Sequence, residues 1–156
     1  MSVVLTPKGT RGVTPPVPTW LIAWLTRIPV ILQRLSGGRM KMHGEPLLVL
    51  TTVGARTGQP RTTMLAQFPE ADGSTLVAAS FGGAAAHPAW YFNLAKHPDQ
   101  VFIDRDGRRI RVQPTSLSGQ EREAAWRRIV SVAPGFAEYQ RKTDREIPVI
   151  RLAPIS

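Results

Sequence analysis

The pattern of apolar and polar positions divides the chain into two N-terminal segments and a longer region of short strands. Residues 1–18 are rich in Pro, Gly and Thr and predict a flexible lead-in, because proline fixes φ and withholds backbone donors. Residues 19–38 predict a helix that Thr19 caps, that is apolar on nearly all sides, and that Pro29 kinks or divides. Beyond residue 38 the apolar period shortens to that of β-strands.

Residues 39–156 predict a mainly β domain with peripheral helices. Asp106-Gly107 is the pair typical of a tight hairpin, and Pro148 marks the last strand as an edge strand or a bulge. Hairpin connections of this kind favour an antiparallel barrel over a doubly wound sheet. The predicted strands cover residues 46–52, 61–68, 75–80, 101–104, 109–114 and 147–152, and the predicted helices are 89–96 after Pro88, 118–132 from a Ser118–Glu121 capping box, and a turn at 136–141.

Composition adds a strong positive charge and several exclusions. The 156 residues fit one domain, and Lys plus Arg exceed Asp plus Glu by 20 to 11, so the protein should attract nucleic acid, acidic lipid or a negatively charged cofactor. The absence of cysteine excludes a disulfide scaffold and a thiolate nucleophile and favours the cytoplasm. The apolar run Trp20–Leu32 is too short and too interrupted to span a bilayer.

The usual signatures of nucleotide, metal and nucleophilic chemistry are missing. Neither a P-loop nor a Rossmann fingerprint occurs, and His43, His87 and His97 stand too far apart to suggest a metal centre. No Ser-His-Asp or paired-carboxylate arrangement stands out. An enzyme of this sequence would therefore take its chemistry from an organic cofactor.

Two glycine-containing stretches are candidates for holding such a cofactor. Gly54-Ala-Arg-Thr-Gly58, followed by Arg61, predicts a turn whose backbone N–H groups and guanidinia bind an anion; the alternative is a basic, solvent-exposed hairpin. In residues 79–88 a strand ends at Ser80, two glycines follow, and a helix begins near His87-Pro88. That segment suits a flat aromatic ligand, or is a flexible loop with a capping histidine.

Aromatic residues supply the remaining candidates. Trp90 and Leu94 share one face of the short helix and predict core packing, whereas Tyr91 and Asn93 could hydrogen-bond a strand or a ligand. Phe136 and Tyr139 share a face of a helical turn and could line a pocket, in which the Tyr139 hydroxyl donates a proton. The alternative is a helix packed on the barrel beside a surface cluster at residues 144–146.

The chain resembles the deazaflavin-dependent nitroreductase family of actinobacteria in three spaced stretches, LLVLTTVGARTGQPRTTML, LVAASFGGAAAHPAWYFNL and PGFAEYQRKTDREIPVIRL. The resemblance implies a split β-barrel of the flavin-reductase or FMN-binding type. It also implies that the protein binds the 8-hydroxy-5-deazaflavin coenzyme F-420 and transfers hydride from its reduced form to a quinone or another electron-poor acceptor, such as a nitro-aromatic compound. A polyanionic coenzyme would explain the positive charge, and no nucleic-acid partner is implied.

The resemblance also assigns roles by motif. Tyr139 and Ser80 would be the catalytic polar groups, with Phe136 and Tyr139 on the acceptor side. Two residues depart from those common in the family: Phe81 removes a polar contact of the implied coenzyme site, and Phe136 implies a drier acceptor pocket with a different acceptor range. The residues implied for the coenzyme are Arg56, Thr57, Gly58 and Arg61 at its phosphate and glutamate tail, Thr63 and Met64 along the deazaflavin, and Ala79, Ser80, Gly82, Gly83, Ala84, His87, Pro88, Trp90 and Tyr91 around its ring and ribityl chain.

Alternatives remain at this point. The N-terminal helix, residues 19–35, either contacts the inner face of the cell membrane peripherally, as in the family, or folds over the barrel. The barrel could instead hold FMN or haem, or the protein could be a non-catalytic basic module that binds membrane or nucleic acid. The oligomeric state is open.

Overall fold

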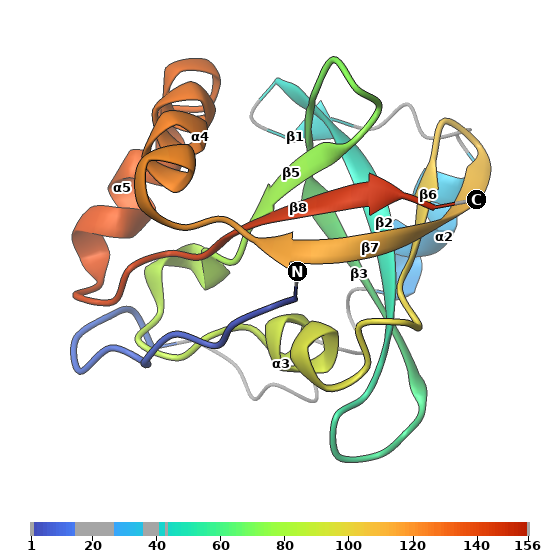
Figure 1. Cartoon of the computed structure of the whole chain (residues 1–156), viewed down its shortest axis with the longest axis horizontal. Coiled ribbons are helices and arrows are strands. Elements are labelled where there is room, and N and C mark those ends of the chain that lie inside the picture. The colour runs from blue at the N-terminus through green and yellow to red at the C-terminus, as the bar shows by residue number, and fades with distance from the viewer. Residues whose placement is uncertain (1, 15–26, 36–40, 43, 156) are drawn as a thin grey trace.

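The computed structural model describes residues 2–14, 27–35, 41, 42 and 44–155 (Figure 1). The predicted helix start at Thr19, with Trp20 and Trp24, lies outside the described residues. The helices are α2 (Arg27–Leu35), the 3-10 turn η1 (Phe81–Gly83), α3 (Ala89–Lys96), α4 (Gly119–Val132) and α5 (Gly135–Lys142). The strands are β1 (Lys41–Met42), β2 (Glu45–Val53), β3 (Pro60–Ala66), β4 (Phe68–Pro69), β5 (Thr75–Ala78), β6 (Phe102–Arg105), β7 (Arg108–Ser116) and β8 (Val149–Pro154).

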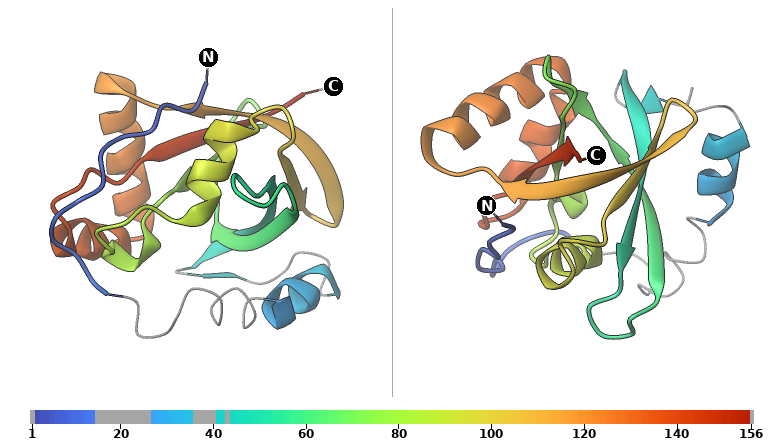
Figure 2. Two further views of the ribbon diagram at one scale, coloured as in Figure 1. Left: turned by 90° about the horizontal axis from the view of Figure 1, so that it is seen from below. Right: turned by 45° about the vertical axis from the view of Figure 1, so that its right-hand side comes forward.

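The described strands form one antiparallel sheet that curls into a partly open barrel (Figures 1 and 2). Their order is β1-β2-β6-β7-β8-β5-β4, and β3, which lies outside this order, also pairs with β2. Among these strands β3 and β4 do not pair with each other, so the barrel stays split between them. The sequence prediction of a mainly β barrel with peripheral helices is confirmed.

Strand alternation sorts the apolar side chains into two cores. One core fills the barrel, where Leu48 and Leu50 of β2 meet Trp90 and Leu94 of α3. The other lies between the sheet and helices α4 and α5, where Leu47 and Phe68 meet Phe136. In Figure 1, α3 lies below the sheet, whereas α4 and α5 stand together at its left side.

Local predictions were mostly confirmed, with two corrections. Asp106 and Gly107 have φ of 53° and 75° and form the expected hairpin turn. The last strand is central, since β8 lies between β7 and β5, and it begins after Pro148 instead of containing it. The capping box does not form: Ser118 makes no side-chain cap bond, and Glu121 pairs with Arg151 at 3.0 Å.

Residues 2–14, which belong to the predicted flexible lead-in of residues 1–18, lie against the body of the protein. This segment, which we call the strap, is hydrogen-bonded along its length to the loop before α3 and to the segment after α5. Gly9 N donates to Ala85 O at 2.8 Å and Val13 N to Gly83 O at 3.0 Å. Asp144 accepts the Thr10 and Arg11 amides at 2.8 and 2.9 Å. Contacts this distant in sequence give no local signal, so composition alone suggested a free segment.

Helix α2 packs on the outer face of β2 and β3. Val30 and Gln33 are buried there, and Gln33 donates to Leu47 O at 2.9 Å. Pro29 lies near the start of α2, where its missing N–H costs little. Ile31, Leu32 and Leu35 point outward and are exposed. No helix in the described part of the chain is long and apolar enough to cross a membrane.

Candidate functional site

The β2–β3 turn carries Arg56, and Arg61 follows it at the start of β3; we call these two arginines the clamp. Gly58 adopts φ of 68°, and Gly54 and Gln59 close the turn with a backbone bond of 2.8 Å. Arg56 and Arg61 are both exposed, and no carboxylate in the described residues pairs with either guanidinium. Two unpaired cations on a closed turn fit an anionic ligand group.

The turn is held in place from below by α3. Asn93 is buried, accepts the Ala55 amide at 2.9 Å and donates to Thr52 Oγ1 at 3.0 Å. Thr57 Oγ1 in turn lies 3.5 Å from an Arg61 terminal nitrogen. The expected bond from Asn93 to a neighbouring strand is confirmed by its bond to Thr52 of β2, and the second bond, from the Ala55 amide, holds the turn that carries the arginines.

The second predicted stretch forms a tight loop, residues 79–84, which we call the glycine loop. Phe81, Gly82 and Gly83 all have positive φ, of 45°, 62° and 85°. Only glycine adopts this region readily, so Phe81 is a conformational outlier of the kind found at functional sites. A side chain at Gly83 would meet Tyr139 O at 2.7 Å, so α5 packs directly on the loop.

Arg145 fixes the glycine loop from within, and sequence reasoning missed it. It was placed in a surface cluster, but its exposed fraction is only 3%. Its guanidinium donates to the carbonyls of Ala79 at 3.0 Å, Ser80 at 2.8 Å and Ala84 at 2.8 Å. The residue types of 143–147 give no sequence signal for this position; the alternating burial that places Arg145 and Ile147 on the inward face is seen only in the structure.

His87 joins Arg145 to the strap. Its Nδ1 lies 3.2 Å from an Arg145 nitrogen, and its Nε2 lies 2.9 Å from Thr6 O. Arg145 can only donate, so the network assigns the neutral ring with hydrogen on Nε2. Burial, followed by the Arg145 charge, lowers the pKa of His87, which agrees with that assignment. Both ring nitrogens are therefore engaged inside the protein.

Tyr91 also serves the strap. The residue is completely buried, its hydroxyl donates to Val4 O at 2.7 Å, and it accepts the Thr6 amide at 3.2 Å. Trp90 is 8% exposed and belongs to the barrel core together with Leu94, as the helical spacing predicts. Of the residues implied for the coenzyme, Tyr91 and Ala79 are completely buried.

An aromatic cluster adjoins the glycine loop on the side of α5. The Phe136 and Tyr139 rings meet edge to face at 5.5 Å, Phe68 meets Phe136 at 5.6 Å, and Met64 packs against the same cluster. Thr63 lies on the opposite face of β3, since neighbouring strand residues alternate. Met64 and Thr63 therefore cannot present their side chains to the same surface.

The predicted residues fall into two groups joined by α3. Arg56, Thr57, Gly58 and Arg61 lie at the hairpin end, whereas the glycine loop, His87 and Pro88 lie at the start of α3, close to α5. Both views place α3 between the hairpin and α5 (Figures 1 and 2). His87 contacts Arg145 beneath the glycine loop and Asn93 holds the Ala55 amide of the hairpin, so residues 87–93 connect the two groups, an arrangement that suits an elongated ligand with an anionic end.

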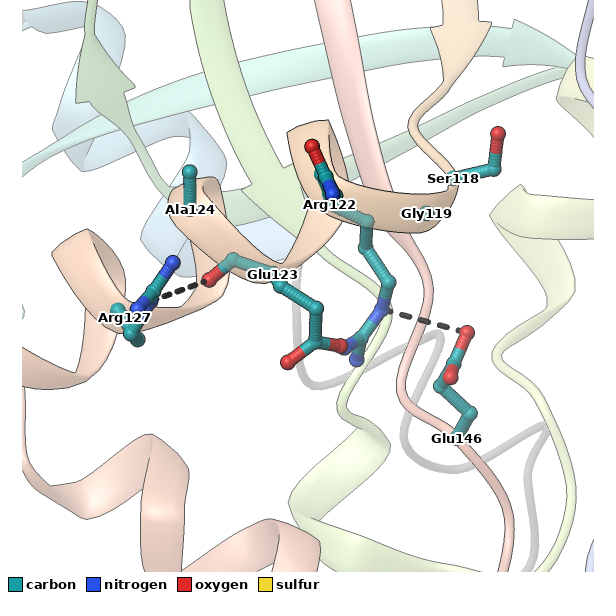
Figure 3. Close-up of a pocket in the computed structure, with 8 residues that line it drawn as sticks. Ser118, Gly119, Arg122, Glu123, Ala124, Arg127 and Glu146 are labelled. Atoms are coloured by element: carbon teal, nitrogen blue, oxygen red, sulfur yellow. Dashed lines mark hydrogen bonds and ion pairs between the residues drawn. The ribbon is translucent and has the colours of Figure 1, made fainter.

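Two pockets of the described structure lie away from these residues. One, of about 750 Å³, opens beside the start of α4, and its lining includes Arg122, Arg127, Glu123 and Glu146 (Figure 3). The other, of about 340 Å³, lies between α2 and the β6–β7 hairpin. The first contains two cations and two carboxylates whose charges cancel, so it lacks the excess positive charge of the clamp.

A barrel that is split between β3 and β4, with a basic turn held by Asn93 of α3 and a glycine loop that precedes α3, defines a split β-barrel of the flavin-reductase type. A profile of the family described as "F420H(2)-dependent quinone reductase" matches residues 24–154. The chain belongs to this family and is an oxidoreductase. The family resemblance inferred from the three sequence stretches is confirmed.

Individual relatives agree. An F420H(2)-dependent quinone reductase of Mycobacterium tuberculosis is 35% identical over 136 residues, which cover 82% of this chain and 89% of the relative. A solved structure described as an F420-H2 dependent reductase is 37% identical, with a TM-score of 0.61 over 68% of this chain and 92% of its own. Another, described as a domain-swapped dimer, is 32% identical, with a TM-score of 0.64 over 86% and 97%.

Proposed function

We propose that this protein binds reduced coenzyme F-420 across the two groups of site residues and reduces a quinone. The observation that carries the proposal is that Asn93 of α3 holds the turn bearing the unpaired Arg56 and Arg61, while the glycine loop precedes the same helix in the chain. When bound, the reduced deazaflavin supplies a hydride. The protein needs only to bind, to orient and to deliver a proton.

The hairpin end suits the coenzyme's phosphate and glutamate tail. Arg56 and Arg61 provide charge-assisted donors, and the Thr57 hydroxyl and the turn backbone provide further polar groups. Asn93 fixes the position of the turn, because its side chain accepts a hydrogen bond from the Ala55 amide. The clamp is thus exposed to the ligand but rigid at its base.

The glycine loop and the aromatic cluster suit the ring and the acceptor. Gly82 has open space around its Cα, so a flat ligand can approach the backbone closely there. Tyr139, partly exposed beside the buried Phe136, is the proposed proton donor to the reduced acceptor. Ser80 at the start of η1 is a second polar group on this side.

We propose a quinone as the acceptor, with nitro-aromatic compounds as a secondary class. The buried Phe136 makes the acceptor side apolar, which favours an acceptor with a flat apolar ring.

A quinone dissolved in lipid would be reached through α2, whose exposed Ile31, Leu32 and Leu35 would lie on a membrane surface. Vesicle co-sedimentation with and without anionic lipid tests this part: no binding to either vesicle contradicts it.

The deciding experiment follows the absorbance of the reduced deazaflavin as menadione is added, in parallel with a fluorescence titration of the coenzyme. Turnover together with saturable binding supports the proposal. Absence of any saturable signal contradicts it, and a co-purified flavin spectrum in the same protein would favour FMN instead. The alternative of a non-catalytic basic module predicts no turnover and a steep salt dependence of polyanion binding.

A further inference from the structure

We propose that Arg145 is the positioning residue of the glycine loop, and that its guanidinium holds residues 79–84 in the conformation that receives the coenzyme. The inference rests on the function proposed above. Arg145 itself lies beneath the loop and does not reach its outer surface, because its bonds go to the backbone carbonyls. Its role would therefore be to act through the loop.

The three carbonyl bonds bracket the loop at both ends. Nε donates to Ala84 O at 2.8 Å, one terminal nitrogen to Ala79 O at 3.0 Å and the other to Ser80 O at 2.8 Å. A planar guanidinium offers these donors in fixed directions, so the separation of the two loop ends is set by the fork. A lysine ammonium is a single point and cannot reproduce this span.

The loop has a strong reason to relax without this fork. Phe81 is held at φ of 45°, which an L side chain adopts only under constraint, and Gly82 and Gly83 continue the left-handed run. Within the loop, the backbone bonds are those from Gly83 N to Ser80 O at 2.9 Å and from Ala84 N to Phe81 O at 3.1 Å. Loss of the guanidinium would leave these two bonds, together with those from Val13 N to Gly83 O and from Ala79 N to Pro148 O, against the strain at Phe81.

The charge of Arg145 also ties the loop to this one arrangement. The side chain is 3% exposed, and none of the ion pairs in the described structure includes it. A buried cation without a carboxylate is costly unless dipoles surround it. Here the loop carbonyls and the neutral His87 ring provide those dipoles, so a rearranged loop would leave the buried Arg145 charge without its carbonyl partners.

The test compares Arg145→Lys with Arg122→Lys. Arg122 is an equally buried arginine, 5% exposed, that donates to a backbone carbonyl, Ile147 O at 2.7 Å, but does not touch the loop. We expect Arg145→Lys to raise the KM for the reduced coenzyme about tenfold, the effect of losing one charge-assisted hydrogen bond, and to leave the KM for menadione within about twofold. Arg122→Lys should change neither KM.

A purely structural role gives a different result. It would reduce the fraction of folded, active protein and so lower the maximal rate, with both KM values unchanged, and that outcome overturns the inference. If Arg145→Lys does not fold, His87→Gln replaces it. This change removes the Nδ1 acceptor of Arg145, and we expect weaker coenzyme binding; unchanged affinity contradicts the inference.

A coenzyme-free readout separates the inference from the proposed function. Amide hydrogen exchange of residues 79–86 in the ligand-free protein should be faster in Arg145→Lys than in the unmodified protein and in Arg122→Lys. If the unmodified protein fails to bind the coenzyme, the proposed function fails, and the exchange rates still decide whether Arg145 positions the loop. Unchanged exchange in Arg145→Lys refutes that role.

Discussion

Removal of the two clamp arginines should weaken coenzyme binding by an amount that the structure bounds. Arg56 and Arg61 are exposed, so solvent screens their charges. A desolvated charge-assisted hydrogen bond contributes about 1.5–3 kcal/mol and an exposed ion pair about 0.2–1 kcal/mol. A cation on a turn with a rigid base lies between these cases, so we expect ~1 kcal/mol, or about fivefold in Kd, for each alanine variant.

The double variant tests whether the two side chains bind the same anion. Arg61 also approaches Thr57 Oγ1 at 3.5 Å, which places both side chains around one turn. Neighbouring groups that share a ligand are not additive. We therefore expect the double variant to lose less than the product of the single effects, or roughly tenfold to twentyfold.

The assay is a fluorescence titration of the coenzyme at low and high salt. Arg108→Ala is the matched control, since Arg108 is an exposed arginine on the β6–β7 turn and its loss also lowers the net charge from +9 to +8. The salt dependence should flatten in the Arg56 and Arg61 variants but not in the control. Equal weakening in all three variants would mean that only the overall charge matters, and no weakening in any would refute the clamp.

Four further outcomes follow from the geometry. Tyr139→Phe should lower turnover with menadione by at least about tenfold, with coenzyme Kd within twofold; equal turnover removes its role as donor. Burial lowers the pKa of His87 below 6.5, so its contribution to the free energy of unfolding is complete above about pH 6.5 and is lost as the pH falls towards the pKa of the folded state. Thermal melts at several pH values should show this loss, and the same pH profile in His87→Gln would contradict it. Hydrogen bonds from Thr10 and Arg11 hold the pKa of Asp144 at about 2, so the strap should stay attached until the pH falls below 3.8 towards a pH of about 2. At neutral pH, Asp144→Asn should make the strap susceptible to limited proteolysis. Gly83→Ala would place its Cβ 2.7 Å from Tyr139 O and should lower the free energy of unfolding by more than about 2 kcal/mol. Gly82→Ala, whose Cβ would have no atom within 4 Å, should lower it by about 1 kcal/mol. Equal melting temperatures of the two variants would contradict the packing of α5 on the loop.

Most of the sheet could be predicted because its signals are local. The Asp106-Gly107 pair fits the two left-handed positions of the β6–β7 turn, and alternating apolar residues mark which strand face enters a core. The short strands β1 and β4 carry only two residues each, too few for any periodicity. Pro148 was misplaced because a proline directly before a strand resembles a proline within it.

The support of the candidate site could not be predicted in the same way. Asp144 binds Thr10 across 134 positions of the chain, and Arg145 reaches Ala79 across 66. Composition makes an acidic-basic-acidic triplet look like a solvated surface, and indeed Asp144 and Glu146 are exposed. The period-two burial from Thr143 to Ile147 distinguishes Arg145 only in the structure, because the residue types Thr-Asp-Arg-Glu-Ile do not show it.

The residues of α3 illustrate how motif resemblance and structural role can differ. Trp90 and Tyr91 belong to a stretch that resembles the coenzyme-binding motif, yet both are buried in the barrel or bonded to the strap. Asn93, within the helix, holds the turn that carries the clamp, and His87, just before the helix, bonds to Arg145 under the glycine loop. Because α3 is anchored in the core between them, it fixes the separation of the two ligand-binding ends. We infer that this stretch serves the coenzyme chiefly by keeping that separation constant.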